Sequence, residues 1–180
     1  EPLLTIYVVQ IGGSAGNASL SSGIVFSAVG VATVIMGSRW GRIGGSIGYE
    51  KTLLIGLIGG GLGNLLQLAV PHLVGFGLLR FGYGLFFAAV YPALNALVIS
   101  YAASDFRGRA VSLSQSASQL GIVVGPLLGG LLGGWIGIPN VFLIMGVALL
   151  LAAWSVKTRK RANSAPAAGG PVETDRKPSI

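Results

Sequence analysis

The sequence predicts an all-α transmembrane protein, a bundle of six helices in which the first helix is truncated. Two observations support this prediction. The 180 residues are 52% hydrophobic and only 9% charged, whereas a soluble domain carries about 25% charged residues. The chain also contains five apolar runs of about the length, roughly 18 residues or more, that crosses a bilayer as a helix. With so few charges the chain could not cover a surface that faces water, so lipid is the expected solvent.

A short apolar segment, residues 2–11, precedes the five full spans. The approximate bounds of the full spans are 22–40, 52–70, 73–103, 110–135 and 139–156. A lipid-crossing helix needs roughly 20 residues, so we expect 2–11 to be the second half of a helix and the sequence to be a piece of a longer chain. Short links make successive helices antiparallel neighbours. Residues 1–156 should form one transmembrane bundle, and the Pro-, Ala-, Gly- and charge-rich residues 157–180 a disordered tail.

The basic residues predict how the bundle is oriented. Of the twelve Lys and Arg residues, all except Arg80 fall at 39–51, at 104–109 or in the tail. Alternating helices place these three regions on one side, and the links on the other side contain no Lys or Arg. The positive-inside rule predicts a multi-pass protein of the cell membrane with loops 41–51 and 104–109 and the tail in the cytoplasm. The net charge of +7 fits attraction to anionic lipid rather than nucleic-acid binding.

Arg80 is a basic residue that we expect inside the bilayer. It follows Leu73 by seven residues, which places it about 10 Å below the outer end of its span at 1.5 Å per residue. A charge at the bilayer centre costs at least ~2.5 kcal/mol on insertion scales, so an intramembrane Arg is a functional candidate. The alternative is structural: Arg80 reaches the outer interface or caps backbone carbonyls and so holds the bundle together.

Below Arg80, one helix face is expected to carry Gly84, Phe87, Tyr91 and Asn95, which recur every three or four residues. Such a stripe could line a cavity for a large apolar or cationic molecule through stacking and cation–π contacts. It could equally be an ordinary packing face between helices.

The span at 110–135 contains a second polar pair and a row of glycines. Gln115 and Gln119 share one face, where they could hydrogen-bond to other helices or contact a ligand. Glycine recurs every fourth residue, at Gly121, Gly125, Gly129, Gly133 and Gly137. This ridge without side chains permits close helix packing, and Pro126 within it should bend the helix. The pattern favours a helix that slides or rocks, although static tight packing would also use it.

Glu1 is another ionisable residue that we expect within the bilayer. If 2–11 is a helix that ends near Ile11, Glu1 lies about 15 Å deep, close to the bilayer midplane. A carboxylate there could carry a proton or attract a cationic substrate; alternatively, Glu1 only marks where the sequence begins. The chain has one His and no Cys, and no spacing typical of a catalytic triad, a metal site or a nucleotide fingerprint. We therefore expect neither an enzyme nor a bound metal or cofactor.

Four stretches give the chain a resemblance to a known family. They are EPLLTIYVVQ at 1–10, SGIVFSAVG at 22–30, LLRFGYGLFFAAVYPALNALV at 78–98 and RAVSLSQSASQLGIVVGPLLGG at 109–130. In their order and spacing, over residues 1–156, they resemble the C-terminal half of the major facilitator superfamily, and within it the twelve-span drug:proton antiporters of multidrug efflux.

The resemblance implies that the six segments are helices seven to twelve. In that fold helices seven and ten line the central cavity. The resemblance therefore strengthens Glu1, Phe87, Tyr91 and Asn95 as candidate cavity residues. The implied mechanism is rocking of two six-helix bundles about a midplane site, with protons entering as a small-molecule substrate leaves. The implied partners are the substrate, protons, the bilayer and an N-terminal six-helix half.

The glycine-rich segment GRIGGSIGYEK at 41–51 resembles the superfamily's cytoplasmic loop signature. Here Arg39, Arg42 and Lys51 would fix topology, and glycines such as Gly41 and Gly48 would permit a tight reversal. The segment departs from the signature, because glycine and serine replace an acid and a base at positions 45 and 46. Arg42 could still pair with Glu50 to stabilise one conformation. Two alternatives to an exporter stay open: a non-transporting membrane scaffold, and an uptake carrier of the same superfamily.

Overall fold

The computed structural model describes residues 18–70 and 72–164, and the side chains of 20–70 and 72–158. Within these ranges the chain forms helices and no strand, which confirms the predicted all-α class. Five helical stretches are long and apolar enough to cross a membrane: Leu20–Ile47, Tyr49–Ala69, Leu73–Tyr101, Ser104–Ile136 and Ile138–Thr158. The truncated span expected at 2–11, with Glu1 before it, lies outside the described residues.

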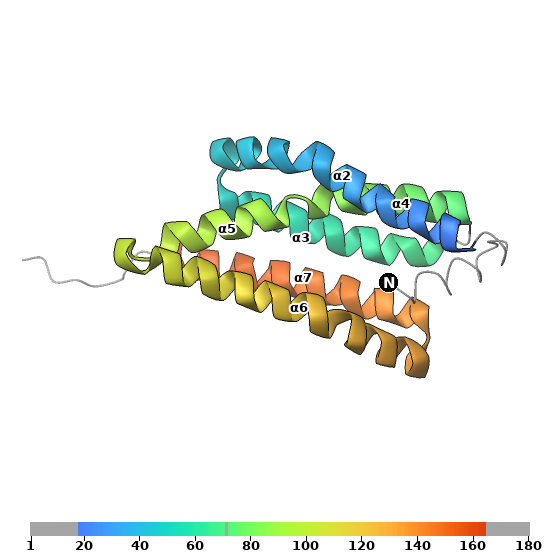
Figure 1. Cartoon of the computed structure of the whole chain (residues 1–180). Coiled ribbons are helices and arrows are strands. Elements are labelled where there is room, and N and C mark those ends of the chain that lie inside the picture. The colour runs from blue at the N-terminus through green and yellow to red at the C-terminus, as the bar shows by residue number, and fades with distance from the viewer. Residues whose placement is uncertain (1–17, 71, 165–180) are drawn as a thin grey trace, which may run out of the picture.

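The helices pack into a bundle with α3 at its centre (Figure 1). Their bounds are α2 Ala18–Ile47, α3 Tyr49–Leu66, α4 Leu73–Phe87, α5 Val90–Tyr101, α6 Arg107–Ile136 and α7 Ile138–Ser164. Helix α7 runs along one side of α3 and α4 along another, while α2 packs chiefly on α4 and α6 on α7 and α5. Buried side chains form three small clusters, around Phe76, Leu57 and Trp40. Many large apolar side chains outside these clusters are exposed, as suits helices whose solvent is lipid.

The predicted loop at 41–51 is wrong, because α2 continues through Ile47 and α3 begins at Tyr49. Gly48 alone separates the two helices, with φ at 93°, a left-handed conformation that glycine adopts without steric cost. The reversal also brings the Tyr49 ring against Gly44, where an added Cβ would lie 2.7 Å from Tyr49 Cδ1. The glycines therefore do permit a sharp reversal, but at a single residue between two helices.

The span predicted at 73–103 is present as one apolar helical stretch, Leu73–Tyr101, but the helix within it is interrupted at Ala88 and Ala89, between α4 and α5. Pro92 supplies a physical reason for the break. Proline has no N–H to donate, and within a helix its ring collides with the carbonyl four residues earlier, which here belongs to Ala88. The sequence contained this signal, but the length of the apolar run concealed it.

The break exposes a carbonyl that a side chain of another helix then uses. The Ala89 N–H donates to the carbonyl of Phe86, three residues back, at 3.0 Å, rather than to Leu85 as in a regular α-helix. The indole N–H of Trp40 on α2 donates to the Leu85 carbonyl at 2.7 Å. Trp40 also packs against Ala88 and Ala89. The interruption is thus held in place by α2.

Replacing Trp40 by Phe should lower the free energy of unfolding by about 1–3 kcal/mol, because the partly buried Leu85 carbonyl loses its donor. The loss should shrink when Pro92→Ala is also present, since an N–H at position 92 allows the helix to re-form. Unfolding in detergent micelles, followed by circular dichroism for the four chains of the double-mutant cycle, measures this coupling. An equal cost of Trp40→Phe in both backgrounds would contradict the account of the break.

Two further boundaries differ from the prediction. In place of a loop at 104–109, a 3₁₀-helix covers Ser104–Phe106 and α6 begins at Arg107. Residues 157–164 of the expected disordered tail belong to α7, which ends at Ser164. Lys, Arg and Ala are strong helix formers, so the helix continues past the apolar span. Residues 165–180 lie outside the described residues, and their disorder stays a prediction.

The closest backbone approaches use glycines other than the predicted ridge. An added Cβ at Gly61 of α3 or Gly146 of α7 would lie 3.1 Å from the carbonyl oxygen of the other. Gly84 of α4 approaches α2 in the same way, with an added Cβ 3.0 Å from the Cα of Val29. On α6, Gly129 is the buried member of the ridge. At Gly121 and Gly125 an added Cβ would meet nothing within 4 Å, and their role in sliding stays a prediction.

Candidate functional site

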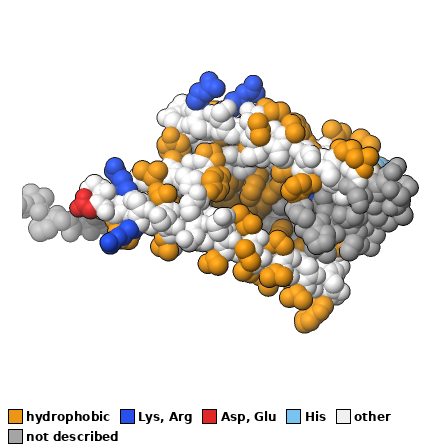
Figure 2. Space-filling view, in the orientation of Figure 1, with side chains coloured by type: hydrophobic (Ala, Val, Ile, Leu, Met, Phe, Trp, Pro, Cys, Tyr) orange, Lys and Arg blue, Asp and Glu red, His pale blue; other side chains and the backbone are white. Residues whose placement is uncertain are grey.

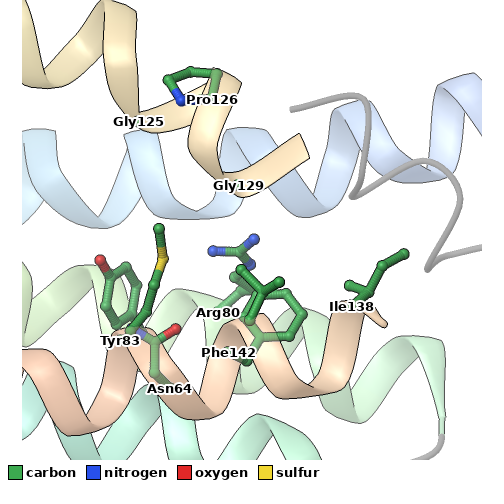
Figure 3. A pocket seen from close by; sticks show the side chains of 10 residues that line it. Asn64, Arg80, Tyr83, Gly125, Pro126, Gly129, Ile138 and Phe142 are labelled. Atoms are coloured by element: carbon green, nitrogen blue, oxygen red, sulfur yellow. The ribbon is translucent and has the colours of Figure 1, made fainter. Parts of the chain in front are cut away.

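A cavity of about 270 Å³ lies among α3, α4, α6 and α7 (Figure 3). Its lining combines one cation, an amide, a phenol and apolar groups: Asn64, Arg80, Tyr83, Gly125, Pro126, Gly129, Ile138, Val141, Phe142 and Met145. Small-molecule pockets begin at about 300 Å³, so this space suits a small molecule or part of a larger one. Because four helices supply the lining, movement of any one of them would change its shape.

Arg80 supplies the cavity with its charge. It lies within α4, seven residues after the helix begins at Leu73, as the sequence predicted. Its guanidinium carbon is 5.6 Å from the ring centroid of Phe76 and 5.4 Å from that of Phe142, and these rings meet edge to face at 6.0 Å. Contacts with aromatic rings stabilise a desolvated cation by about 2 kcal/mol each, which helps to offset its burial. The guanidinium extends toward α6, opposite Gly129 (Figure 3).

Asn64 and Tyr83 are functional candidates that sequence reasoning missed. Asn64 is only 3% exposed, and it lines the cavity from α3. Tyr83 lies nearly one turn after Arg80 and stacks on Phe87, with ring centroids 5.2 Å apart and planes at 17°. An amide within an otherwise apolar span is a recognisable signal, although the sequence alone did not place Asn64 in the same cavity as Arg80.

The residues of the predicted stripe below Arg80 do not line the Arg80 cavity, and their place in a larger cavity stays a prediction. Gly84 faces α2, and Phe87 packs on Tyr83 and beside Gly60 of α3. Past the break, Tyr91 is 52% exposed. Asn95 is half-buried, and Gln119 is exposed. Of the predicted candidates, the cavity thus contains Arg80 and three residues of the α6 ridge, Gly125, Pro126 and Gly129.

Two of the predicted polar residues meet outside the cavity. The hydroxyl of Tyr91 on α5 donates a hydrogen bond to Oε1 of Gln115 on α6. The bond links the two helices on the side of the Ala88–Ala89 break away from Arg80. Gln115 therefore fulfils one of the two roles expected for it, a hydrogen bond across helices.

Replacing Tyr91 by Phe should cost about 0.6 kcal/mol of unfolding free energy, the average for such bonds within a membrane. Gln115→Leu should cost a similar amount, and the double variant no more than either single one, because both remove the same bond. Thermal melts in micelles test this. Fully additive costs would show that the pair does not interact in solution.

The residues of the loop signature occupy helix ends. Arg39, Gly41 and Arg42 lie in the last turns of α2, and Lys51 lies in the first turn of α3. Beside Lys51, Glu50 accepts a hydrogen bond from the hydroxyl of Tyr101 at the end of α5. The expected pairing of Glu50 with Arg42 stays a prediction.

The space-filling view shows where charged side chains lie on one face of the molecule (Figure 2). Blue Lys and Arg side chains lie over the C-terminal part of α2 and where α5 passes to α6, while orange apolar side chains are spread among white ones over the face. No group of three or more His, Cys, Asp or Glu side chains that could hold a metal ion occurs in the part of the chain that the structure describes.

Five apolar helical spans, with basic residues at helix ends and a cavity between helices, define an integral, multi-pass membrane protein. The chain belongs to the Major Facilitator Superfamily, whose family model matches residues 2–178. This confirms the resemblance inferred from the sequence.

Curated relatives narrow the similarity further. The chain is 35% identical over 161 residues to the multidrug resistance protein MdtG of Klebsiella pneumoniae (strain 342). The matched region covers 89% of this chain and 39% of that protein. It is 34% identical over 161 residues to the protein of the same name from Escherichia coli (strain K12 / DH10B), covering 89% of this chain and 40% of the relative. The chain thus spans about two fifths of the length of these relatives.

Proposed function

We propose that the chain is the C-terminal half of a secondary active transporter that exports drugs or other small amphipathic molecules in exchange for protons. The observation that carries this proposal is the similarity to multidrug resistance proteins over 89% of the chain. The N-terminal partner is a second six-helix bundle. The two halves would rock about a site near the bilayer midplane, and this chain alone would not transport.

The geometry supports a particular part for the Arg80 cavity in this function. The cavity lies between α6 and the helices α3, α4 and α7, and an added Cβ on α6 would meet nothing within 4 Å at Gly121 or Gly125. A shift of α6 along its neighbours would therefore meet little resistance there and would reshape the cavity. Coupling of this kind, between a site and a movable helix, is what alternating access requires.

The charge of the cavity bears on the class of substrate. Its described lining contains the cation of Arg80, together with the amide of Asn64 and the phenol of Tyr83, but no acidic side chain. A carboxylate or carbonyl oxygen of a substrate would find charged and neutral donors there. We therefore favour neutral or acidic amphipathic aromatic compounds, whereas the sequence suggested apolar or cationic ones.

Transport by the full-length protein in proteoliposomes tests the function. The probes are a fluorescent aromatic acid and the cationic amine analogue of the same ring system, each measured with an imposed proton gradient of either direction. We expect the probe and protons to move in opposite directions, and the acid to be transported faster than the amine. Flux in the same direction as protons would instead indicate an uptake carrier. No flux for any of a broad panel of compounds would favour the non-transporting scaffold.

A separate experiment tests the proposed orientation. The chain contains no Cys, so a single introduced thiol has no competitor within it. Ser46 near the end of α2 and His72 before α4 are both exposed and lie at opposite ends of α3. A membrane-impermeant maleimide should modify Ser46→Cys only from the cytoplasmic side and His72→Cys only from outside. The reverse pattern would overturn the proposed orientation.

A further inference from the structure

A second hollow, distinct from the Arg80 cavity, runs between α3 and α4 on the surface of the bundle. Its volume is about 510 Å³, and its lining is almost entirely apolar: Ile55, Ile58, Gly59, Leu62, Gly63, Leu66, Leu78, Leu79, Gly82, Tyr83 and Phe86. Several of these side chains are strongly exposed, among them Leu62 at 49% and Leu78 at 68%. Tyr83 alone belongs to the described lining of both spaces. We call this hollow the α3–α4 groove.

Glycines give the groove its depth. At Gly59 an added Cβ would lie 2.4 Å from Phe86 Cγ, and at Gly63 it would lie 3.2 Å from Tyr83 Cβ. The aromatic side chains of α4 therefore rest on bare backbone of α3 and form the floor. At Gly82 an added Cβ would meet nothing within 4 Å. A missing side chain at position 82 thus leaves room in the groove itself.

The length of the groove matches one leaflet of a bilayer. From Ile55 to Leu66 the helix rises about 17 Å, close to half of the roughly 30 Å hydrocarbon core. Leu66 lies three residues before the end of its membrane span at Ala69. The groove therefore begins about 5 Å from the C-terminal end of this span and extends past its middle, to about 9 Å from the other end, at 1.5 Å per residue.

We propose that the α3–α4 groove binds one acyl chain of a phospholipid from the leaflet that surrounds the C-terminal end of α3. An extended hydrocarbon chain fits both the length and the apolar lining, which offers the phenol of Tyr83 but no charged side chain. Lipid tails are as apolar as leucine, so the hydrophobic effect does not favour the groove over bulk lipid. The preference comes from dispersion contacts with a concave wall. The proposal does not depend on the transport function.

Photolabelling in vesicles tests this site. The full-length protein is reconstituted with phosphatidylcholine that carries a diazirine in the middle of one acyl chain, and the labelled residues are located by mass spectrometry. Labels should concentrate on the groove residues of α3 and α4. Gly82→Leu, which fills the open space, should reduce labelling there at least about threefold by removing the concave contacts. Leu62→Trp fills the groove from the other helix and should act in the same way.

The matched control is Gly30→Leu on α2, where an added Cβ also meets nothing within 4 Å. It should leave labelling of the groove unchanged, and equal melting temperatures of the variants would show that folding is unaffected. Equal labelling of the groove in Gly82→Leu and the unaltered protein would overturn the proposal, as would labels spread evenly over all lipid-facing helices. Crosslinks between groove residues of two protein molecules would also overturn it, by showing that a second copy occupies the groove.

Discussion

Replacing Gly146 by leucine should leave almost no folded bundle, whereas the same change at Gly121 should leave the fold intact. An added Cβ at Gly146 would lie 2.9 Å from Leu65 Cγ and 3.1 Å from the carbonyl oxygen of Gly61. A carbonyl within a helix cannot move aside, so α3 and α7 would have to separate. Overpacking usually costs about 1–3 kcal/mol, and a clash with backbone belongs at or above the top of this range.

The control, Gly121→Leu, makes the same substitution as Gly146→Leu but at a position without close neighbours. Both glycines lie within helices, so both substitutions gain helix propensity, by somewhat less than the roughly 0.8–1.0 kcal/mol that separates glycine from alanine. At Gly121 nothing lies within 4 Å of an added Cβ. The measurement is the yield of monodisperse protein from membranes, by fluorescence-detected size exclusion, together with its melting temperature. Comparable yields of the two variants would contradict the close contact of α3 with α7.

Replacing Arg80 by glutamine should raise the KM for an acidic substrate of the full-length transporter about tenfold, because a loss of ~1.4 kcal/mol in binding corresponds to that factor. Glutamine keeps a polar end group but removes the charge and with it the cation–π contacts with Phe76 and Phe142. Arg80→Lys should lose less, since it retains the charge but not the planar group.

A structural role for Arg80 gives a different result. If the guanidinium only braces the two rings, Arg80→Gln lowers the melting temperature while the KM for acidic and neutral substrates stays equal to that of the unaltered protein. Lys157→Gln provides the control, because it removes one charge from an exposed position on α7, away from the cavity. A KM that is unchanged for acids in Arg80→Gln would remove Arg80 from the substrate site.

The lengths of the apolar runs were sufficient to predict the spans, because a helix needs that length to cross the lipid. They could not locate the breaks between helices. Gly48 illustrates this: a single positive-φ residue reverses the chain, although eleven polar and glycine-rich residues suggested a loop. Pro92 illustrates the converse, because a break within an apolar run leaves its hydropathy unchanged. Local backbone chemistry, rather than composition, fixed both features.

The candidate site was predictable only in part, for a similar reason. Arg80 stood out because a charge within a span is costly and rare. Asn64 and Phe142 did not, because their importance arises from packing between helices that are distant in sequence. The glycine pattern of α6 was visible as a period of four, yet the closest backbone contacts belong to Gly61 and Gly146. Periodicity identifies a smooth face but not the partner that lies against it.

The bond from Trp40 to the Leu85 carbonyl makes the interruption of the α4–α5 span optically observable. The chain has three tryptophans; Trp135 and Trp154 are 87% and 66% exposed, whereas Trp40 is 9% exposed and packs on the break itself. In a chain with Trp135→Phe and Trp154→Phe, the emission of this single indole would report whether the two halves of the span change their angle. The protein thus carries a native fluorophore at the joint where a change of helix angle would occur.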